Sequence, residues 1–215
     1  MNRPIQFEYC VPESQKLADL FGILEDLKRA IRYSDLHIEI DPTAVGISID
    51  EIMRREDTRQ ALCRAAFVSY VRCFGTGVRS GLGVDFLERL SSELQQRHRQ
   101  VKDLRDKWVT HSVNFFDDVR VRLQATHDAS GELEVKEVTI ASQSVGGFIQ
   151  AWMIAFRDLF IVVRDLVQHD ISAESQRLLE QAKKIPIEKL RQMERVDGVP
   201  LTRKTLDPSQ SRGKF

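Results

Sequence analysis

The chain has 215 residues, of which 42% are hydrophobic and 30% are charged, and its 32 Lys and Arg balance its 32 Asp and Glu. This composition is typical of a globular protein with one sizeable domain, and it excludes a collagen, a disulfide scaffold and a wholly disordered chain. A formal net charge of zero also argues against a surface covered everywhere by nucleic acid, while local basic patches remain compatible with it.

The cysteines and the N-terminal residues bear on the compartment. Cys10, Cys63 and Cys73 show no paired metal-ligand spacing, so the sequence indicates neither a zinc site nor a disulfide framework. The N-terminal residues lack the apolar segment of a signal peptide, and charged residues interrupt the most apolar stretch, Val145 to Val167. We therefore expect a cytoplasmic protein with no membrane span, no metal and no cofactor.

Two amphipathic helices are predicted in the first third of the chain. Apolar residues recur at helical spacing over about 13–33, and an irregular connection over 34–47 follows. Ser48 and Glu51 then match a capping box, in which the two side chains satisfy free backbone N–H groups at the start of a helix. That helix is expected to extend over about 48–74.

Four glycines between 75 and 83 end the second helix, and the most regular predicted element follows over about 84–112. Its apolar residues alternate in steps of three and four, which produces a heptad-like stripe along one side. Arg97 and His111 are the two polar members of this stripe.

The period of the pattern then changes from that of a helix to that of a strand. Apolar and polar residues alternate over 119–125, and a turn with Asp first and Gly last follows at 128–131. The alternation slips between Val135 and Val138, which predicts a bulge in the second strand. We expect a β-hairpin over about 118–141, inserted between helices.

The last third is predicted to hold one long apolar helix, one short helix and a tail. The helix over about 144–170 is apolar nearly all round, which favours a place in the core or in a homodimer interface. A short helix is expected over 172–184, and residues 186–215 are predicted to form an extended or disordered basic tail. The fold class is therefore mainly α: a bundle of four or five helices in one domain over 1–185, with an inserted hairpin.

The sequence contains no glycine-rich nucleotide loop, no zinc-peptidase motif and no serine-hydrolase elbow. The segment that stands out is Leu104-Arg105-Asp106-Lys107-Trp108-Val109-Thr110-His111, at the end of the third predicted helix. It resembles the motif of the HEPN superfamily, which has an arginine, a polar neighbour and a histidine after four to six intervening residues. Arg105, Asp106 and His111 match that pattern here.

The resemblance is best to the HEPN-like proteins of bacterial abortive-infection and related defence systems. It implies a helical bundle that dimerises around the motif. In active members it implies cleavage of RNA without a metal ion, whereas other members are catalytically silent.

The residue types in the motif suit this chemistry. A neutral histidine such as His111 can take the proton from a ribose 2′-OH, which then attacks the adjacent phosphate. The guanidinium of Arg105 can stabilise the added negative charge through two parallel hydrogen bonds. Six residues at about 100° each separate the two side chains by roughly 120° on an ideal α-helix, so convergence requires a distorted helix end, the reach of arginine or a second subunit.

Two alternatives stand beside this interpretation. Arg164 and His169 form a second pair with a polar neighbour near a helix end, and we favour Arg105 and His111 because the whole local segment resembles the family. His111 also has a purely structural interpretation, because it continues the apolar stripe and its charge would suit the C-terminal end of the helix.

Further candidate residues for binding RNA or phosphate lie on the third predicted helix and around the glycine-rich connection: His98, Lys102, Arg97, Arg72 and Arg79. The helical set would form a basic ridge or simply a solvated helix face. The other two arginines would bind phosphate or tie the connection to helix ends. Their proximity is compatible with a lowered pKa of the Cys73 thiol.

The leading hypothesis is a HEPN-like bacterial protein that acts as a metal-independent ribonuclease of a toxin–antitoxin or phage-defence system, with RNA and a cognate antitoxin or defence protein as partners. The alternative is a non-catalytic helical interaction module that binds a partner protein. A third possibility is a small-molecule or nucleotide sensor that uses Arg72 and Arg79, which a deep polar pocket at those residues would favour.

Overall fold

A computed structural model describes residues 7, 9, 11–41, 44–75, 79–109, 117–127, 132–144 and 150–193. Over these residues the chain is mainly helical, with one two-stranded antiparallel hairpin. The α-helices are α1 (Pro12–Glu39), α2 (Ile49–Val71), α3 (Val84–Leu87), α4 (Ser92–Leu104), α5 (Gln150–Ala182) and α6 (Ile187–Gln192). A 3-10 helix (Arg72–Phe74) follows α2, a π-helix (Arg105–Val109) follows α4, and the strands are β1 (Asp117–His127) and β2 (Leu133–Ser144).

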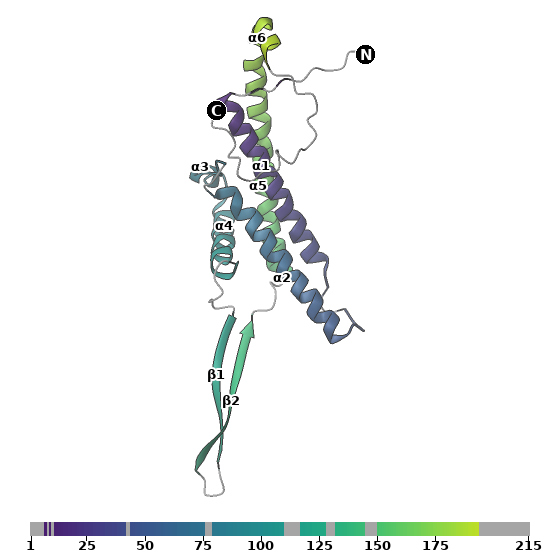
Figure 1. Cartoon of the computed structure of the whole chain (residues 1–215), viewed down its shortest axis with the longest axis vertical. Helices are drawn as coiled ribbons and strands as arrows, with labels where there is room; N and C mark the ends of the chain where they lie inside the picture. The colour runs from purple at the N-terminus through teal and green to yellow at the C-terminus, as the bar shows by residue number, and fades with distance from the viewer. Residues whose placement is uncertain are drawn as a thin grey trace.

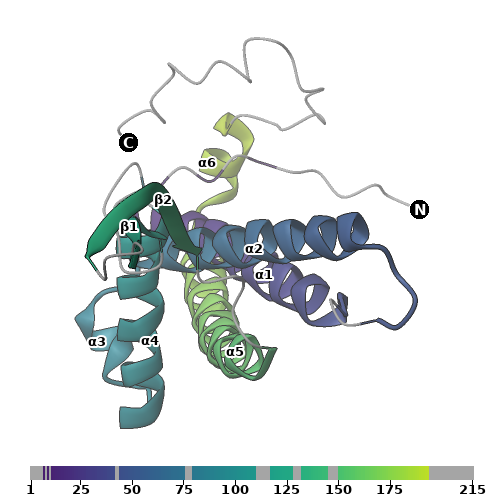
Figure 2. The same ribbon diagram turned by 90° about the horizontal axis from the view of Figure 1, so that it is seen from below.

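Helices α1, α2 and α5 form the centre of the helical body. Helix α1 packs along α5 and against α2, while α4 lies on α2 and α5 at one side (Figures 1 and 2). The hairpin projects from the opposite end to α6, away from the helices (Figure 1). No helix among the described residues is long and apolar enough to cross a membrane.

Apolar side chains from four helices meet in one core. Leu27 of α1, Phe67 of α2, Val101 of α4 and Phe156 of α5 are all inaccessible or nearly so. The rings of Phe67 and Phe156 meet edge to face with their centroids 5.5 Å apart. Because burying one such side chain contributes roughly 1.5–3 kcal/mol, this core accounts for the association of the helices.

Local signals explain where two of the helices begin. The Ser48 hydroxyl accepts a hydrogen bond from the Glu51 backbone N–H at 3.2 Å, as the predicted cap requires. The Glu51 carboxylate binds Arg54 and Arg55 instead of returning to Ser48, so the capping box is only half formed. Helix α4 begins in the same way, because the hydroxyl of Ser91 accepts from the N–H of Leu94.

Three predicted helix boundaries were wrong. The helix expected over 84–112 is broken between α3 and α4, because Ser91 caps a new helix, and its α-helical part ends at Leu104. Helix α1 continues to Glu39 through residues expected in an irregular connection. The two helices expected over 144–170 and 172–184 are one helix, since Ile171 and Leu178 continue the buried side of α5.

The hairpin confirms the predicted insertion and its bulge. Gln124 pairs with Glu137 and Ala125 pairs with Val135, so Lys136 is the extra residue in β2. The predicted turn at 128–131 lies outside the described residues.

In the predicted tail, residues 187–192 form α6 rather than an extended segment, while 194–215 also lie outside the described part of the chain. The boundary at residue 185 stays a prediction.

Candidate functional site

The segment that resembles the HEPN motif lies where α4 changes into the π-helix. Arg105 is the first residue of the π-helix and Asp106 the second. A guanidinium nitrogen of Arg105, Nη1, lies 2.9 Å from Oδ1 of Asp106. The side chains are 32% and 44% exposed, so a ligand in solvent can reach both. π-Helical segments are rare, and many of them occur at functional sites.

The structure therefore brings two of the three motif residues together. His111 lies between Val109 and Asp117, outside the described residues, so its position relative to Arg105 stays a prediction. The α-helical hydrogen-bond pattern ends at Leu104. The angle of roughly 120° expected on an ideal α-helix therefore does not apply across this segment.

One interpretation of the sequence placed His98 on an exposed basic ridge, and the structure shows that this was wrong. Its ring is buried, its Nδ1 is hydrogen-bonded to the Tyr70 hydroxyl at 2.9 Å, and it contacts the Phe74 ring at a centroid distance of 4.4 Å. Burial, together with the charges of Lys102 and Arg99, lowers the pKa of His98 to about 4. The imidazole is therefore neutral at pH 7 and belongs to the core.

The other polar residues predicted on this helix differ in exposure. Lys102 is exposed, as the interpretation of a basic face expects. Arg97 instead donates a hydrogen bond to the backbone carbonyl of Ala155 at 3.1 Å and pairs with Glu93, so its guanidinium connects α4 to α5. Of the three residues of the predicted ridge, Lys102 is therefore the one whose side chain is exposed.

Arg72 and Arg79 converge on one buried carboxylate, that of Asp26 in α1. Arg79 forms a direct ion pair with Asp26, and Nε of Arg72 lies 3.8 Å from the same carboxylate. The Arg79 side chain passes so close to Gly22 that an added Cβ would lie 2.6 Å from its Nη1. The two arginines thus hold the glycine-rich connection and the end of α2 against α1.

The Cys73 thiol is not activated by these arginines. It is buried, and burial, assisted by the charge of Asp26, raises its pKa to about 12. The thiol lies within 4 Å of the carbonyl oxygens of Ser69 and Ile23. The lowered pKa considered from the sequence was therefore wrong, because the carboxylate and the desolvation outweigh the two guanidinium groups.

The competing pair, Arg164 and His169, lies on α5. Arg164 pairs with its neighbour Asp165 at 2.7 Å, whereas the exposed His169 ring lies 3.6 Å from Asp170. Five residues on a regular α-helix place two side chains roughly 140° apart, so these two face different directions. The geometry gives this pair no common site.

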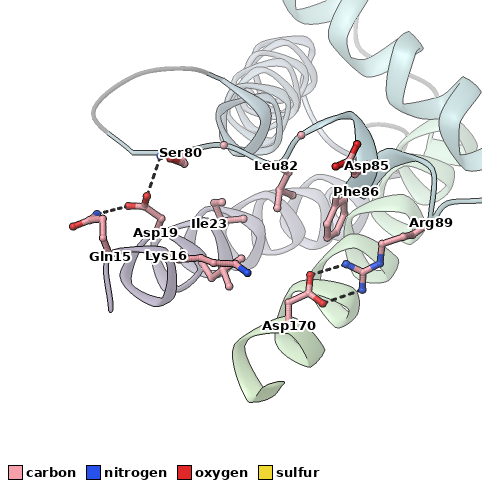
Figure 3. Close-up of a pocket in the computed structure, with 13 residues that line it drawn as sticks. Gln15, Lys16, Asp19, Ile23, Ser80, Leu82, Asp85, Phe86, Arg89 and Asp170 are labelled. Carbon is pink, nitrogen blue, oxygen red and sulfur yellow. Dashed lines mark hydrogen bonds and ion pairs between the residues drawn. The ribbon is translucent and has the colours of Figure 1, made fainter. Parts of the chain in front are cut away.

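A cavity of about 650 Å³ lies between α1, the connection that precedes α3, and α5 (Figure 3). The buried Asp19 carboxylate accepts hydrogen bonds there from the backbone N–H of Ser80 at 3.0 Å and from Gln15 at 2.7 Å. At the opposite side, Arg89 and Asp170 form a two-point ion pair at 2.6 and 3.0 Å. Arg72 and Arg79 do not line this cavity, so it is not the pocket that a sensor built on them would need.

Sequence reasoning missed the residues of this cavity. Asp19 and Ser80 are 61 residues apart, and Arg89 and Asp170 are 81 residues apart. Neither pair belongs to a local motif, so only the packing of the helices reveals them. Among the described residues, no three His, Cys, Asp or Glu side chains are grouped so that they could hold a metal ion.

Comparisons of this chain with protein-family models, with curated proteins and with solved structures found no match.

Proposed function

We propose that this chain is a HEPN-like RNA-cleaving protein that needs no metal ion, with its reactive centre at the end of α4. The observation that carries the proposal is the pairing of Arg105 with Asp106 at a solvent-accessible π-helical end, within the segment that resembles the HEPN motif. A mainly helical fold is what that resemblance implies.

Each motif residue has a distinct part in the proposed reaction. His111 takes the proton from the ribose 2′-OH, and the oxygen then attacks the adjacent phosphorus atom. Arg105 stabilises the negative charge that develops on the phosphate oxygens. Asp106, whose Oδ1 lies 2.9 Å from Nη1 of Arg105, restrains the orientation of the guanidinium. The bond between phosphorus and the 5′-oxygen then breaks, and the protonated His111 returns its proton to that departing oxygen. The products are a 2′,3′-cyclic phosphate and a free 5′-hydroxyl.

The surroundings of Arg105 support the binding of a polyanion. Arg99 and Lys102 are exposed on the preceding turns of α4 and carry positive charge. Such side chains attract the phosphate backbone of RNA through a long-range interaction that weakens as the salt concentration rises. The proposed setting is a bacterial toxin–antitoxin or phage-defence system, in which a cognate protein restrains the nuclease.

Expression in a bacterial host tests the proposal. The wild-type chain is expected to arrest growth, whereas His111→Ala and Arg105→Ala, each shown to fold, are expected not to. Arg164→Ala and His169→Ala are the matched controls, because they alter the competing pair and are expected to stay toxic. Toxicity that persists in both motif variants and disappears in the controls would contradict the proposal.

A second candidate function is a non-catalytic module that binds a partner protein. The exposed apolar side chains of the hairpin favour it, because such surfaces commonly mark interaction sites. The same variants separate the two functions: if all four fold and leave every measured property of the wild type unchanged, the resemblance concerns only the scaffold.

A further inference from the structure

Three arginines, Arg29, Arg72 and Arg79, surround the buried carboxylate of Asp26 and form an arginine cluster. Nη1 of Arg29 donates a hydrogen bond to Oδ1 at 3.1 Å. Arg79 binds Oδ2, and Nε of Arg72 lies 3.8 Å from the same oxygen. Arg29 belongs to α1, whereas Arg72 begins the 3-10 helix after α2 and Arg79 lies in the glycine-rich connection. Three separate parts of the chain therefore place their guanidinium groups around one carboxylate.

The arginine cluster carries more positive charge than the carboxylate neutralises. Three guanidinium groups against one carboxylate leave an excess of two positive charges (3 − 1 = 2). The adjacent carboxylate of Glu25 pairs with Lys28 at 2.7 Å, so that pair adds no net charge. Arg32 is exposed on the next turn of α1 and adds a further positive charge. Like charges held this close repel one another, and a bound anion relieves the repulsion.

Two of the three guanidinium groups are open to solvent. The side chains of Arg29 and Arg72 are 57% and 61% exposed, whereas that of Arg79 is 21% exposed. Toward the described residues, the Arg72 side chain makes no hydrogen bond, since 3.8 Å is too long for one, and Arg29 makes only the bond to Asp26. Each guanidinium has five N–H donors, so most of the donors of these two arginines remain available to a ligand.

The charge and the donors favour a phosphate group as the ligand. The planar guanidinium fork matches the oxygen atoms of phosphate and of carboxylate. A carboxylate carries a single charge, whereas a phosphate monoester carries about −1.5 to −2 at pH 7 and has three acceptor oxygens, which balances the excess of two. Arg29 and Arg72 both lie within 4 Å of the Asp26 carboxylate, so one phosphate can contact both. Asp26 itself is only 2% exposed, so the ligand meets the guanidinium groups rather than the carboxylate.

We propose that Arg29 and Arg72 bind the phosphate group of a small molecule at the surface formed by α1 and the end of α2. Asp26 positions the two arginines, and Arg79 neutralises its carboxylate. The site shares no residue with the Arg105 segment or with the cavity beside Asp19, so it does not depend on RNA cleavage. Because the ligand contacts two separate elements of the folded chain, its binding stabilises the fold.

Titration of the full chain with inorganic phosphate, at an ionic strength held constant with sodium chloride, tests the proposal. The wild type is expected to bind phosphate and to melt at a higher temperature in its presence. Arg72→Gln is expected to bind on the order of tenfold more weakly, because it loses charge-assisted hydrogen bonds. Arg54→Gln is the matched control, because it removes an equally exposed arginine of α2 and is expected to bind like the wild type. A wild type that does not bind phosphate, or an Arg72→Gln chain that binds as tightly as Arg54→Gln, would overturn the proposal.

A second variant keeps the proposal falsifiable if Arg72→Gln disturbs the end of α2. Arg29→Gln changes an exposed side chain within α1, and it is expected to weaken phosphate binding by a similar factor with unchanged helical circular dichroism. Undiminished binding by a folded Arg29→Gln chain would count against the site.

Arg105→Ala separates this site from the proposed reactive centre. It is expected to abolish RNA cleavage and to bind phosphate like the wild type. Loss of phosphate binding in Arg105→Ala would place the ligand at the Arg105 segment and overturn the proposal. A wild type that binds phosphate through Arg29 and Arg72 but cleaves no RNA would contradict the proposed function alone.

Discussion

Lowering the pH from 7 to 5 should destabilise the fold through two buried histidines. His37 in α1 and His98 in α4 are both buried in the core. Burial and the charge of Arg59 lower the pKa of His37 to about 4, and burial with Lys102 and Arg99 does the same for His98. In the unfolded chain both residues titrate near pH 6.5.

The sign and size of the effect follow from these pKa values. The folded pKa lies below the unfolded one, so the unfolded state binds protons first as the pH falls. The contribution of the two neutral histidines to the free energy of unfolding is complete above pH 6.5, and it is lost progressively as the pH falls to about 4. For each histidine the free energy of unfolding falls by up to about 1.4 kcal/mol per pH unit, which gives a loss of about 2 kcal/mol between pH 6.5 and 5. The two histidines together therefore account for a loss of at most about 4 kcal/mol.

Urea denaturation at a series of pH values measures this loss. His98→Asn removes one titrating group and retains a polar atom near the Tyr70 hydroxyl, so it is expected to lower the stability at pH 8 and to roughly halve the slope between pH 6.5 and 5. His169→Ala, which removes an exposed imidazole, is the matched control. Stability that stays constant from pH 7 to 5, or an unchanged slope in His98→Asn, would refute the reasoning.

Three further predictions concern the ion pair at Asp26 and the proposed reaction. Arg79→Ala should lower the free energy of unfolding by about 2 kcal/mol, because it leaves the Asp26 carboxylate buried with weaker partners, and adding Asp26→Asn should restore part of that loss in urea melts. Arg105→Lys should reduce RNA cleavage on the order of 10²-fold although the charge is kept, since one ammonium cannot reproduce the guanidinium contacts; near-normal cleavage rates in gel assays would count against its role. Cleavage should continue in EDTA and should stop when the ribose at the cleaved position is replaced by deoxyribose, because the 2′-OH is the proposed nucleophile; EDTA sensitivity would indicate a different reaction.

Local chemistry explains the features that the sequence predicted correctly. The cap at Ser48 depends on one hydroxyl and one N–H three residues away. The hairpin bulge depends on a slip in the alternation that is visible between Val135 and Val138. Such features involve neighbouring residues, so their patterns survive in a single sequence.

Long-range packing explains the features that the sequence did not predict. His98 was expected on a basic face, yet the Tyr70 hydroxyl, 28 residues away, draws its ring into the core. Arg79 forms an ion pair with Asp26, which is 53 residues away in the sequence. Because of this ion pair, Arg79 holds the glycine-rich connection against α1 and does not line a pocket. The continuation of α1 to Glu39 likewise depends on tertiary contacts, among them the ion pair of Asp35 with Arg157 of α5.

The most direct test of the central claim is the chemical analysis of RNA ends after incubation with the purified chain. The wild type is expected to produce 2′,3′-cyclic phosphate and 5′-hydroxyl ends, and a folded His111→Ala variant is expected to leave the RNA uncut. Intact RNA with the wild type under conditions in which the chain is folded, or the same ends at the same rate with His111→Ala, would contradict it.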